Sequence, residues 1–362
     1  MKKPSVCISP LDWGLGHATR CIPLIQSLQE LGYQVYIASE KNQEAILKEA
    51  IPNARFLYLQ GYRIKYAKWG VLLPFVLLFQ VPKIIYSIFH EYNWLKKAQL
   101  VYEFDLIISD NRYGFFHTST PSVFITHQLN LQTPMKWTTN LFQKMQYAWL
   151  KKFNACWIPD TEGPNNLSGI LANPEKKPST RLWYMGCLSR LEQQKITDAI
   201  TDKNIFLGMV SGPEPQRTLL ENLLWEKGNE LNIKFALVAG TPLNDKAFKK
   251  TTQSIVYPHL TAVELVQQIH AAEYIICRGG YSTLIELIPF RKKLILIPTP
   301  GQTEQLYLGK LWQEKNWALC YHQENLNLKT ALAEASQFNF VQTPFIAFST
   351  LALKNELKQL TL

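Results

Sequence analysis

The feature that most constrains the fold of this chain is the alternation of short apolar runs with amphipathic stretches of helical periodicity. This alternation is typical of α/β domains built on a parallel sheet. In the first half, strands are expected over residues 5–10, 34–39, 104–110 and 121–127, with a helix over about 18–31. In the second half, strands are expected over 204–210, 234–240, 254–260, 273–280 and 293–299, with helices near 216–226 and 262–270. We therefore expect an α/β protein of two Rossmann-like, parallel-sheet domains facing a cleft.

Two proline-rich loop segments, "PDTEGPNN" and "ANPEKKPST", follow the first series of strands. They place the domain boundary near residues 186–195. We expect a first domain over residues 1–188 and a second over 189–343. A last helical piece, over 344–362, could cross back to the first domain.

The composition is that of a globular protein, since 47% of the residues are hydrophobic and only 18% are charged. The six cysteines show no C-x-x-C pair and no metal-like spacing to histidine, which favours reduced thiols. The N-terminal "MKKPSVCISP" lacks the long apolar core of a signal peptide. These features predict a cytoplasmic location.

The net charge of +10 is concentrated between residues 61 and 97, where six lysines and arginines accompany one glutamate. Within this segment, "WGVLLPFVLLFQVP" (69–82) is apolar but broken by prolines and shorter than the roughly 20 residues of a membrane-spanning helix. A basic, apolar segment of this kind suits the inner face of an anionic membrane. The alternative is that it forms core helices whose lysines are solvated. Nucleic acid is not expected, because the basic residues alternate with aliphatic ones.

The loop after the first expected strand, "LDWGLGHATRC", raises the question of a dinucleotide site. Gly14 and Gly16 fit the fingerprint G-x-G-x-x-G, but Thr19 stands where the third glycine belongs, so an NAD site is not supported. A glycine loop at a helix N-terminus still favours an anion. We expect the Arg20 side chain either to face a bound phosphate or to reach out to solvent. His17, biased toward its neutral form, is a candidate general base, or else a turn histidine with local hydrogen bonds.

The second half contains two similar junctions of strand, glycine and helix. "MVSGPEPQR" places Ser211 and Gly212 after a strand and Arg217 near a first helical turn. "CRGGYSTLIEL" places Gly279 and Gly280 before a helix. Thr283 and Glu286 have the spacing of a capping box, so Glu286 either caps its own helix or reaches the hydroxyls of a ribose.

The run from Val256 to Cys320 resembles the donor half of GT-B glycosyltransferases, and is most similar to family 28, typified by MurG. In that family an apolar loop holds uracil, a "GG-x-S-T-x-x-E" segment holds diphosphate and ribose, and a glutamine-rich loop holds the sugar. By this resemblance, the nucleotide-sugar site takes in the two junctions just described and two further loops. Its residues are Ser211, Gly212 and Arg217 in the first loop, Tyr257, Pro258 and His259 at the base, Arg278, Gly279, Gly280, Ser282 and Thr283 at the diphosphate, Glu286 at the ribose, and Gln302, Thr303, Glu304 and Gln305 at the sugar.

In the first half the resemblance is confined to two loops. "GLGHATR" resembles the family loop G-x-G-G-H, with His17 in the histidine position, and "PSVFITHQLN" matches the strand that runs into H-E-Q-N. These loops imply an acceptor-binding first domain with Gly14, Gly16, Arg20, His127 and Gln128 at the cleft. The stretch Gly14–Cys21 is also similar to nucleotide-sugar hydrolases of the pseudaminic-acid pathway, in which water is the acceptor. The residues of non-hydrolysing sugar-nucleotide epimerases are not found.

The resemblance implies an inverting transfer of a hexose or N-acetylhexosamine from a UDP-sugar to an acceptor hydroxyl, on a lipid-linked or membrane-associated glycan of the cell envelope. No D-x-D motif occurs, so neither a metal nor another cofactor is expected. His17 is the first choice of base and Asp110, at the end of "LIISD", the second; Asp110 could instead cap the turn "NRYG". The alternatives are a nucleotide-sugar hydrolase and a non-catalytic nucleotide-sugar-binding protein.

Overall fold

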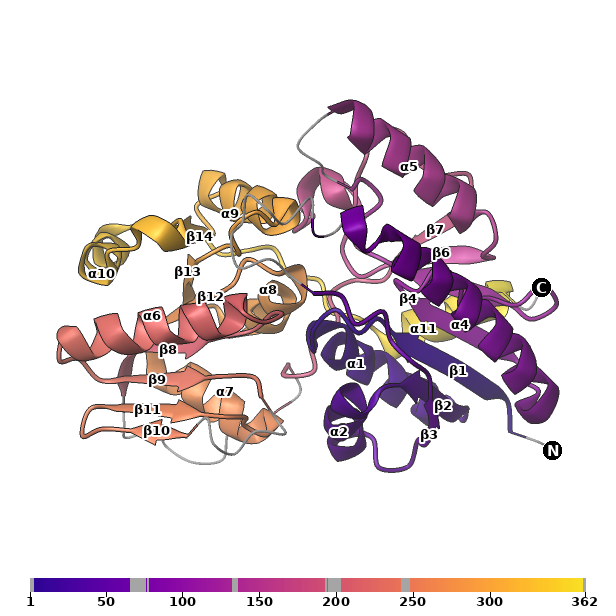
Figure 1. The fold of residues 1–362 in the computed structure, drawn as a ribbon, viewed down its shortest axis with the longest axis horizontal. Helices are drawn as coiled ribbons and strands as arrows, with labels where there is room; N and C mark the ends of the chain where they lie inside the picture. Colours follow the sequence, from indigo (N-terminus) through magenta and orange to yellow (C-terminus); the bar gives the residue numbers. More distant parts are fainter. Residues whose placement is uncertain are drawn as a thin grey trace. The chain divides into compact units, whose positions relative to one another are not determined.

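The computed structural model describes residues 3–65, 76, 78–131, 136–192, 194, 203–241 and 248–360. The chain divides into two units. Unit 1 comprises Met1–Ile64, Phe79–Leu188 and Pro344–Leu362, and unit 2 comprises Lys65–Leu78 and Ser189–Thr343. Figure 1 shows a sheet with packed helices in each unit.

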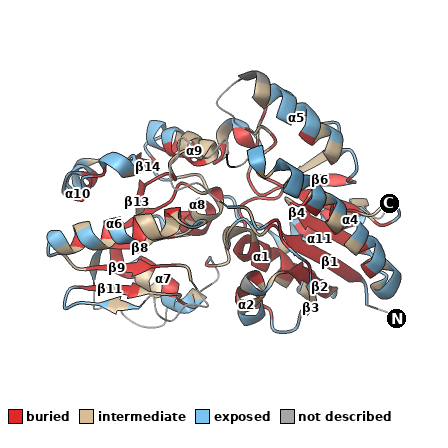
Figure 2. Ribbon diagram, viewed as in Figure 1, coloured by how far each residue is buried: buried red, intermediate tan, exposed pale blue. Residues whose placement is uncertain are grey.

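The sheet of unit 1 has the strand order β3-β2-β1-β4-β5-β6-β7, and all its pairings are parallel. Its strands are β1 (Ser5–Pro10), β2 (Gln34–Ser39), β3 (Arg55–Tyr58), β4 (Leu106–Asp110), β5 (Ser122–Ile125), β6 (Ala155–Ile158) and β7 (Arg181–Tyr184). Its helices are α1 (Gly16–Glu30), α2 (Lys41–Ala50), α4 (Val81–Tyr102), α5 (Lys136–Leu150) and α11 (Thr350–Leu360), with the 3₁₀ turn η2 (Gly169–Leu171). The central strands are buried along their length, as parallel sheets covered by helices require (Figure 2).

Helix α11 is held in unit 1 by a buried carboxylate. Glu356 lies 4% exposed, pairs with Arg181 of β7, and accepts a hydrogen bond from the indole nitrogen of Trp157 at 2.8 Å. These contacts tie the end of the chain to β6 and β7.

The sheet of unit 2 has the order β10-β11-β9-β8-β12-β13-β14, parallel except for the β10–β11 pair. Its strands are β8 (Asn204–Met209), β9 (Phe235–Val238), β10 (Lys249–Lys250), β11 (Ser254–Tyr257), β12 (Ala272–Cys277), β13 (Lys293–Leu296) and β14 (Ala318–Cys320). Its helices are α6 (Gln216–Glu230), α7 (Ala262–Ala271), α8 (Tyr281–Leu287), α9 (Thr303–Glu314) and α10 (Leu328–Gln337), with 3₁₀ turns η4 (Ile288–Phe290) and η5 (Gln323–Asn325). An aromatic and aliphatic cluster, including the stacked rings of Phe206 and Phe235, forms its core.

In each sheet the chain order reverses once at the centre, between β1 and β4 in unit 1 and between β8 and β12 in unit 2. Ligands of parallel α/β sheets bind beyond the carboxyl ends of the strands at such reversal points. The loops after β1, β4, β8 and β12 are therefore where a site is expected in each unit.

The fold expected from the sequence is confirmed, and each strand predicted from its apolar run is present, with shorter bounds for several of them. The first helix begins at Gly16 rather than near Ala18, so His17 lies within its first turn. All six cysteines are free thiols. Most of the apolar segment 69–82 lies outside the described residues, and among those described no helix combines the length and apolar character needed to cross a bilayer.

Candidate active site

Three side chains from distant parts of unit 1 meet beyond the carboxyl ends of β1 and β4. His17 and Arg20 lie in the first turns of α1, and Asp110 is the last residue of β4. The Nδ1 atom of His17 lies 3.0 Å from Asp110 Oδ2, and Arg20 Nε donates to the same oxygen at 3.0 Å. A second guanidinium nitrogen of Arg20 contacts Asp110 Oδ1. The site therefore contains a histidine and a carboxylate joined as a dyad, with an arginine alongside.

The expectations for Arg20 were wrong. It neither reaches solvent nor is open to a bound phosphate, because its side chain is buried and its guanidinium forms an ion pair with Asp110. A buried guanidinium requires a counter-charge, and Asp110 provides it. Arg20 can thus act on an acceptor only through its neighbours.

Asp110 is also buried, at 0% exposure, which argues against its role as an alternative base. Burial disfavours its charged form, but Arg20 and His17 outweigh that effect and hold the pKa of the carboxyl well below its usual range. Nor does it cap the turn after β4, since its side chain bonds to α1. Its contact with Nδ1 restrains the orientation of the His17 ring.

His17 has the environment of a neutral imidazole. Burial, followed by the positive charge of Arg20, lowers its pKa below 6.5, while Asp110 opposes the shift. Its side chain is 14% exposed, and within the described residues its Nε2 makes no hydrogen bond. Nδ1 also lies 2.9 Å from Arg20 Nη2, so its role depends on the tautomer. In the tautomer whose Nδ1–H donates to Asp110, Nε2 has a free lone pair, as a general base requires.

His127 and Gln128 follow β5, which neighbours β4. The buried His127 lies with its Nδ1 3.2 Å from a guanidinium nitrogen of Arg20, and the half-buried Gln128 begins a turn in which its N–H donates to Thr126. Gly14 has a φ of +90° with open space beside it, whereas Gly16 begins α1. The structure thus groups Gly14, Gly16, His17, His127 and Asp110 of the predicted residues at one edge of the sheet.

A second network of side chains, which the sequence did not predict, holds the loop that follows β1. Arg112 and Glu91 form an ion pair at 0% exposure, with an Nε–Oε1 distance of 2.7 Å. Arg112 also donates to the carbonyl of Pro10, and the carboxylate of Asp12 accepts from the backbone N–H groups of Tyr62 and Arg63. The one sign of this network in the sequence is Glu91, the sole acidic residue of the basic segment 61–97. A lone carboxylate in such a segment often forms an ion pair with a buried cation.

In unit 2, Ser211 and Gly212 follow β8 and Arg217 lies in the first turn of α6, as predicted, but the Arg217 side chain is bonded to carboxylates. Gly212 has a φ of +107° and no neighbour within 4 Å of an added Cβ, and Ser211 is half-buried. Arg217 donates to Glu214 at 2.7 Å and to Glu221 at 2.9 Å. Arg217 would therefore have to break its bonds to both carboxylates before it could contact a diphosphate.

The loop after β12 contains a buried cation without a buried carboxylate partner. Arg278 is 1% exposed and donates to the carbonyls of Ile297, Pro298 and Gln216, while its Nε has no hydrogen-bond partner among the described residues. Burial lowers the pKa of this guanidinium. It directly precedes Gly279 and Gly280, the residues that the resemblance assigns to the diphosphate.

The capping box expected at Thr283 and Glu286 is absent. Helix α8 begins at Tyr281 with Gly280 as its N-cap, so Thr283 lies inside the helix. Glu286 bonds instead to Arg190, with Arg190 Nε 3.1 Å from Glu286 Oε1. Arg190 is thus a site residue that the sequence analysis did not identify.

The remaining predicted residues lie at strand ends, in loops and in the first turns of helices of this sheet. Half-buried Tyr257 ends β11, and Pro258 and His259, also half-buried, follow it. Half-buried Ser282 lies in α8. Around the start of α9, Gln302 Oε1 is buried without a partner among the described residues, and Thr303 and Glu304 are half-buried. Gln305 is buried and its Oε1 accepts from the backbone of Thr299 at 2.8 Å, so this carbonyl supports the loop.

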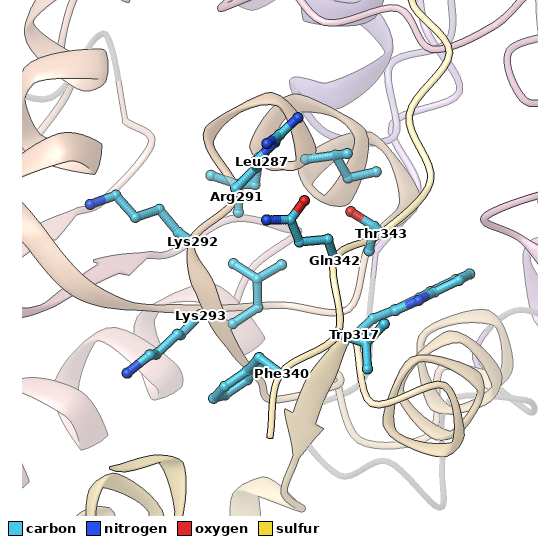
Figure 3. Close-up of a pocket in the computed structure, with 11 residues that line it drawn as sticks. Leu287, Arg291, Lys292, Lys293, Trp317, Phe340, Gln342 and Thr343 are labelled. Atoms are coloured by element: carbon cyan, nitrogen blue, oxygen red, sulfur yellow. The ribbon is translucent and has the colours of Figure 1, made fainter. Parts of the chain in front are cut away.

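A cavity of about 210 Å³ in unit 2 does not belong to this site (Figure 3). It is lined by residues at the starts of β13 and β14, which is the edge opposite to the glycine loops. Figure 3 shows Lys292 and Lys293 extending away from Gln342 and Thr343. Lys292 donates to the carbonyls of His270 and Ala272. We assign no role in catalysis to this cavity.

Comparison with known proteins relates the chain to glycosyltransferases. Residues 219–342 match the glycosyltransferase family 28 C-terminal domain. An uncharacterized glycosyltransferase from Methanosarcina mazei is 20% identical over 309 residues, covering 81% of this chain and 79% of the relative.

Two solved structures are similar over most of the chain. One is Phytolacca americana UGT2 complexed with UDP-2-fluoro-glucose and pterostilbene, with a TM-score of 0.60 and 12% identity over 100% of this chain and 94% of that one. The other is Acinetobacter baumannii MurG, with a TM-score of 0.50 and 13% identity over 93% and 90%. The chain is therefore a glycosyltransferase of the GT-B fold, and residues 219–342 of its second unit match the model of the family 28 C-terminal domain.

Proposed function

We propose that the enzyme transfers a hexose or N-acetylhexosamine from a UDP-sugar to a hydroxyl of a lipid-linked or membrane-associated glycan, with inversion at the anomeric carbon. The observation that carries this proposal is the dyad of His17 and Asp110 in a chain that also has a family 28 donor domain. The donor class is further supported by the UDP-sugar in the Phytolacca complex.

The proposed reaction is a single displacement. His17 Nε2 takes the proton of the acceptor hydroxyl, whose oxygen attacks the anomeric carbon as the bond to the diphosphate breaks. Asp110 stabilises the imidazolium that forms. We expect Arg278 and the N–H groups at the start of α8 to stabilise the negative charge of the leaving UDP. No metal takes part in this proposal, so turnover should persist in EDTA.

The acceptor class is inferred from the surface of α4. Four large apolar side chains, one just before the helix and three in its first half, are exposed by 49–84%: Phe79, Ile85, Tyr86 and Phe89. Exposed apolar groups of this size on one helix mark an interaction surface. Lys96 and Lys97 are exposed on the same helix, whereas Glu91, its acidic residue, is buried with Arg112. An apolar helix face with only positive charge exposed suits an anionic bilayer.

Helix α5 extends this surface. Leu141, Phe142 and Met145 are exposed by 44–51%, and Lys144 lies among them. Aromatic residues of α4 and α5 pack against the same core cluster, so both helices cover one face of the sheet of unit 1. The alternative, that these helices only form core, accounts for their buried faces and not for the exposed ones.

The first experiment measures UDP release from UDP-N-acetylglucosamine and UDP-glucose, with and without vesicles that contain a polyprenyl-linked glycan. A transferase releases UDP at a substantial rate only with the glycan and forms a glycosylated lipid. Release at the full rate without any acceptor would instead show a hydrolase, and binding without release a nucleotide-sugar-binding protein; each refutes the proposal.

The second experiment is sedimentation with vesicles of phosphatidylglycerol and phosphatidylcholine at low salt. Wild type should sediment with the vesicles, and the double variant Phe79→Ser/Phe89→Ser should remain in solution. A matched control is Phe248→Ser, which removes a phenylalanine exposed by 53% in unit 2. Wild type that stays in solution would exclude the membrane partner.

A further inference from the structure

The ion pair between Arg190 and Glu286 in unit 2 bears on which nucleotides the enzyme binds. The exposed fractions of the two side chains are 12% and 7%, and the atoms in contact are Arg190 Nε and Glu286 Oε1, 3.1 Å apart. The hydroxyl of Ser189 donates to the backbone carbonyl of Glu286 at 3.4 Å. Two consecutive residues at the start of this part of unit 2 thus hold the same residue of α8.

The segment that holds Glu286 is itself well anchored. Ser189 is 5% exposed and Leu191 is fully buried, so Arg190 extends from a backbone fixed on both sides. A buried carboxylate needs a counter-charge, and Arg190 is the cation that bonds to it. Without Arg190, the three side-chain torsions of Glu286 would lose this restraint.

The pair leaves part of the carboxylate available. Arg190 bonds to Oε1, and within the described residues Oε2 of Glu286 has no hydrogen bond. An ionised carboxylate accepts hydrogen bonds and donates none, so it suits a pair of neighbouring hydroxyls. The cis-diol of a ribose presents such a pair, whereas a 2′-deoxyribose presents a single hydroxyl.

We infer that Arg190 is a positioning residue that fixes the Glu286 carboxylate for the diol of a ribonucleotide, and that it thereby makes the enzyme prefer ribonucleoside over 2′-deoxyribonucleoside diphosphates. This inference rests on the proposed function, in which Glu286 binds the ribose of the donor. Arg190 acts through Glu286 and not on the reacting atoms.

The test compares the affinities of UDP and 2′-deoxy-UDP for the full chain by titration calorimetry. A charge-assisted hydrogen bond contributes about 1.5–3 kcal/mol, so wild type should prefer UDP by about tenfold or more. Arg190→Gln should lose most of this preference by weakening UDP binding while affinity for 2′-deoxy-UDP changes little. Arg190→Lys should restore part of it. Lys227→Gln, which removes a cation paired with Glu230 on the surface of unit 2, should retain the full preference.

Glu286→Gln separates this inference from the proposed function. If it abolishes the preference for UDP while Arg190→Gln retains it, Glu286 binds the ribose but Arg190 does not position it, and the inference fails. If Arg190→Gln weakens both nucleotides equally, its role is not specific to the ribose and the inference also fails. If wild type binds neither nucleotide, or Glu286→Gln keeps the preference, the proposed ribose site itself is wrong.

Discussion

Replacing Asp110 by asparagine should destabilise unit 1 strongly, because it leaves Arg20 buried and unpaired. Both side chains are fully buried, and two of their contacts join nitrogen to carboxylate oxygen. Asparagine has nearly the same shape but no charge, and its amide would place a donor against a donor. Breaking a buried ion pair by removing one partner costs about 3–5 kcal/mol. Since 1 kcal/mol corresponds to about 2–4 °C in a unit of 150–250 residues, the Tm of unit 1 should fall by about 6–20 °C.

The assay is a double-mutant cycle followed by calorimetry and urea unfolding. Arg20→Met removes the other partner, and the double variant Asp110→Asn/Arg20→Met removes both. Because neither single variant leaves its neighbour satisfied, the double variant should be less destabilised than the sum of the singles by at least about 2 kcal/mol. The control is Glu44→Gln, which breaks the exposed pair with Lys48 and should change stability by less than about 1 kcal/mol.

The pH dependence provides an independent check. The pKa of Asp110 is lower in the folded protein than the value of about 3.9 in an unfolded chain. Its stabilisation is therefore fully present above that value and is lost as the pH falls through the folded pKa. In Asp110→Asn this acid-dependent part should be missing. Additive single variants, or a loss below about 1 kcal/mol for Asp110→Asn, would refute the assignment of this pair.

Other predictions concern catalysis and backbone geometry. His17→Gln should lower transfer by about 10²–10⁴-fold, measured as glycosylated product, while UDP affinity stays unchanged; unchanged turnover would remove His17 as the base. Because the pKa of His17 is lowered and the base must be neutral, kcat/KM should fall on the acid side only below pH 6.5; a half-maximum above that pH would contradict the shift. Gly114→Ala should unfold unit 1 in calorimetry, since the added Cβ would lie 2.0 Å from the carbonyl oxygen of Ile88. Gly163→Ala, with a φ of +86° but open space, should cost only about 1 kcal/mol, and an equal effect of the two would refute the steric argument.

The fold could be predicted from local patterns because the central strands are buried on both faces. "SVCISP" and "EYIICRGG" are continuous apolar runs followed by turn residues, and both are central strands of their sheets. Strands β3, β6, β7, β10 and β14 were not predicted. The runs of β3 and β7 contain charged or half-exposed residues such as Arg55 and Arg181, and β14 spans only three residues. Edge position and shortness remove the apolar signal on which such predictions depend.

The predicted site residues lie at the carboxyl ends of strands in each unit, but their side-chain contacts could be predicted only in part. Glycine loops after strands locate the backbone, because chain direction and strand ends follow from the sequence. Ion pairs between residues far apart in the chain do not follow from local patterns. Arg20 and Asp110 are separated by 90 residues, and Arg190 and Glu286 by 96. Arg20 lies near the N-terminus of α1, whereas its partner Asp110 ends strand β4.

Two of the buried arginines, Arg20 and Arg278, differ in how their charge is neutralised. In unit 1, Asp110 neutralises Arg20 beside His17, which suits a neutral acceptor hydroxyl there better than an anion. In unit 2, Arg278 bonds to backbone carbonyls alone among the described residues, and its Nε lacks an acceptor. A buried cation without an anion is costly unless a ligand supplies the charge. This charge next to Gly279 and Gly280 is the reason why we propose that the donor diphosphate binds in unit 2.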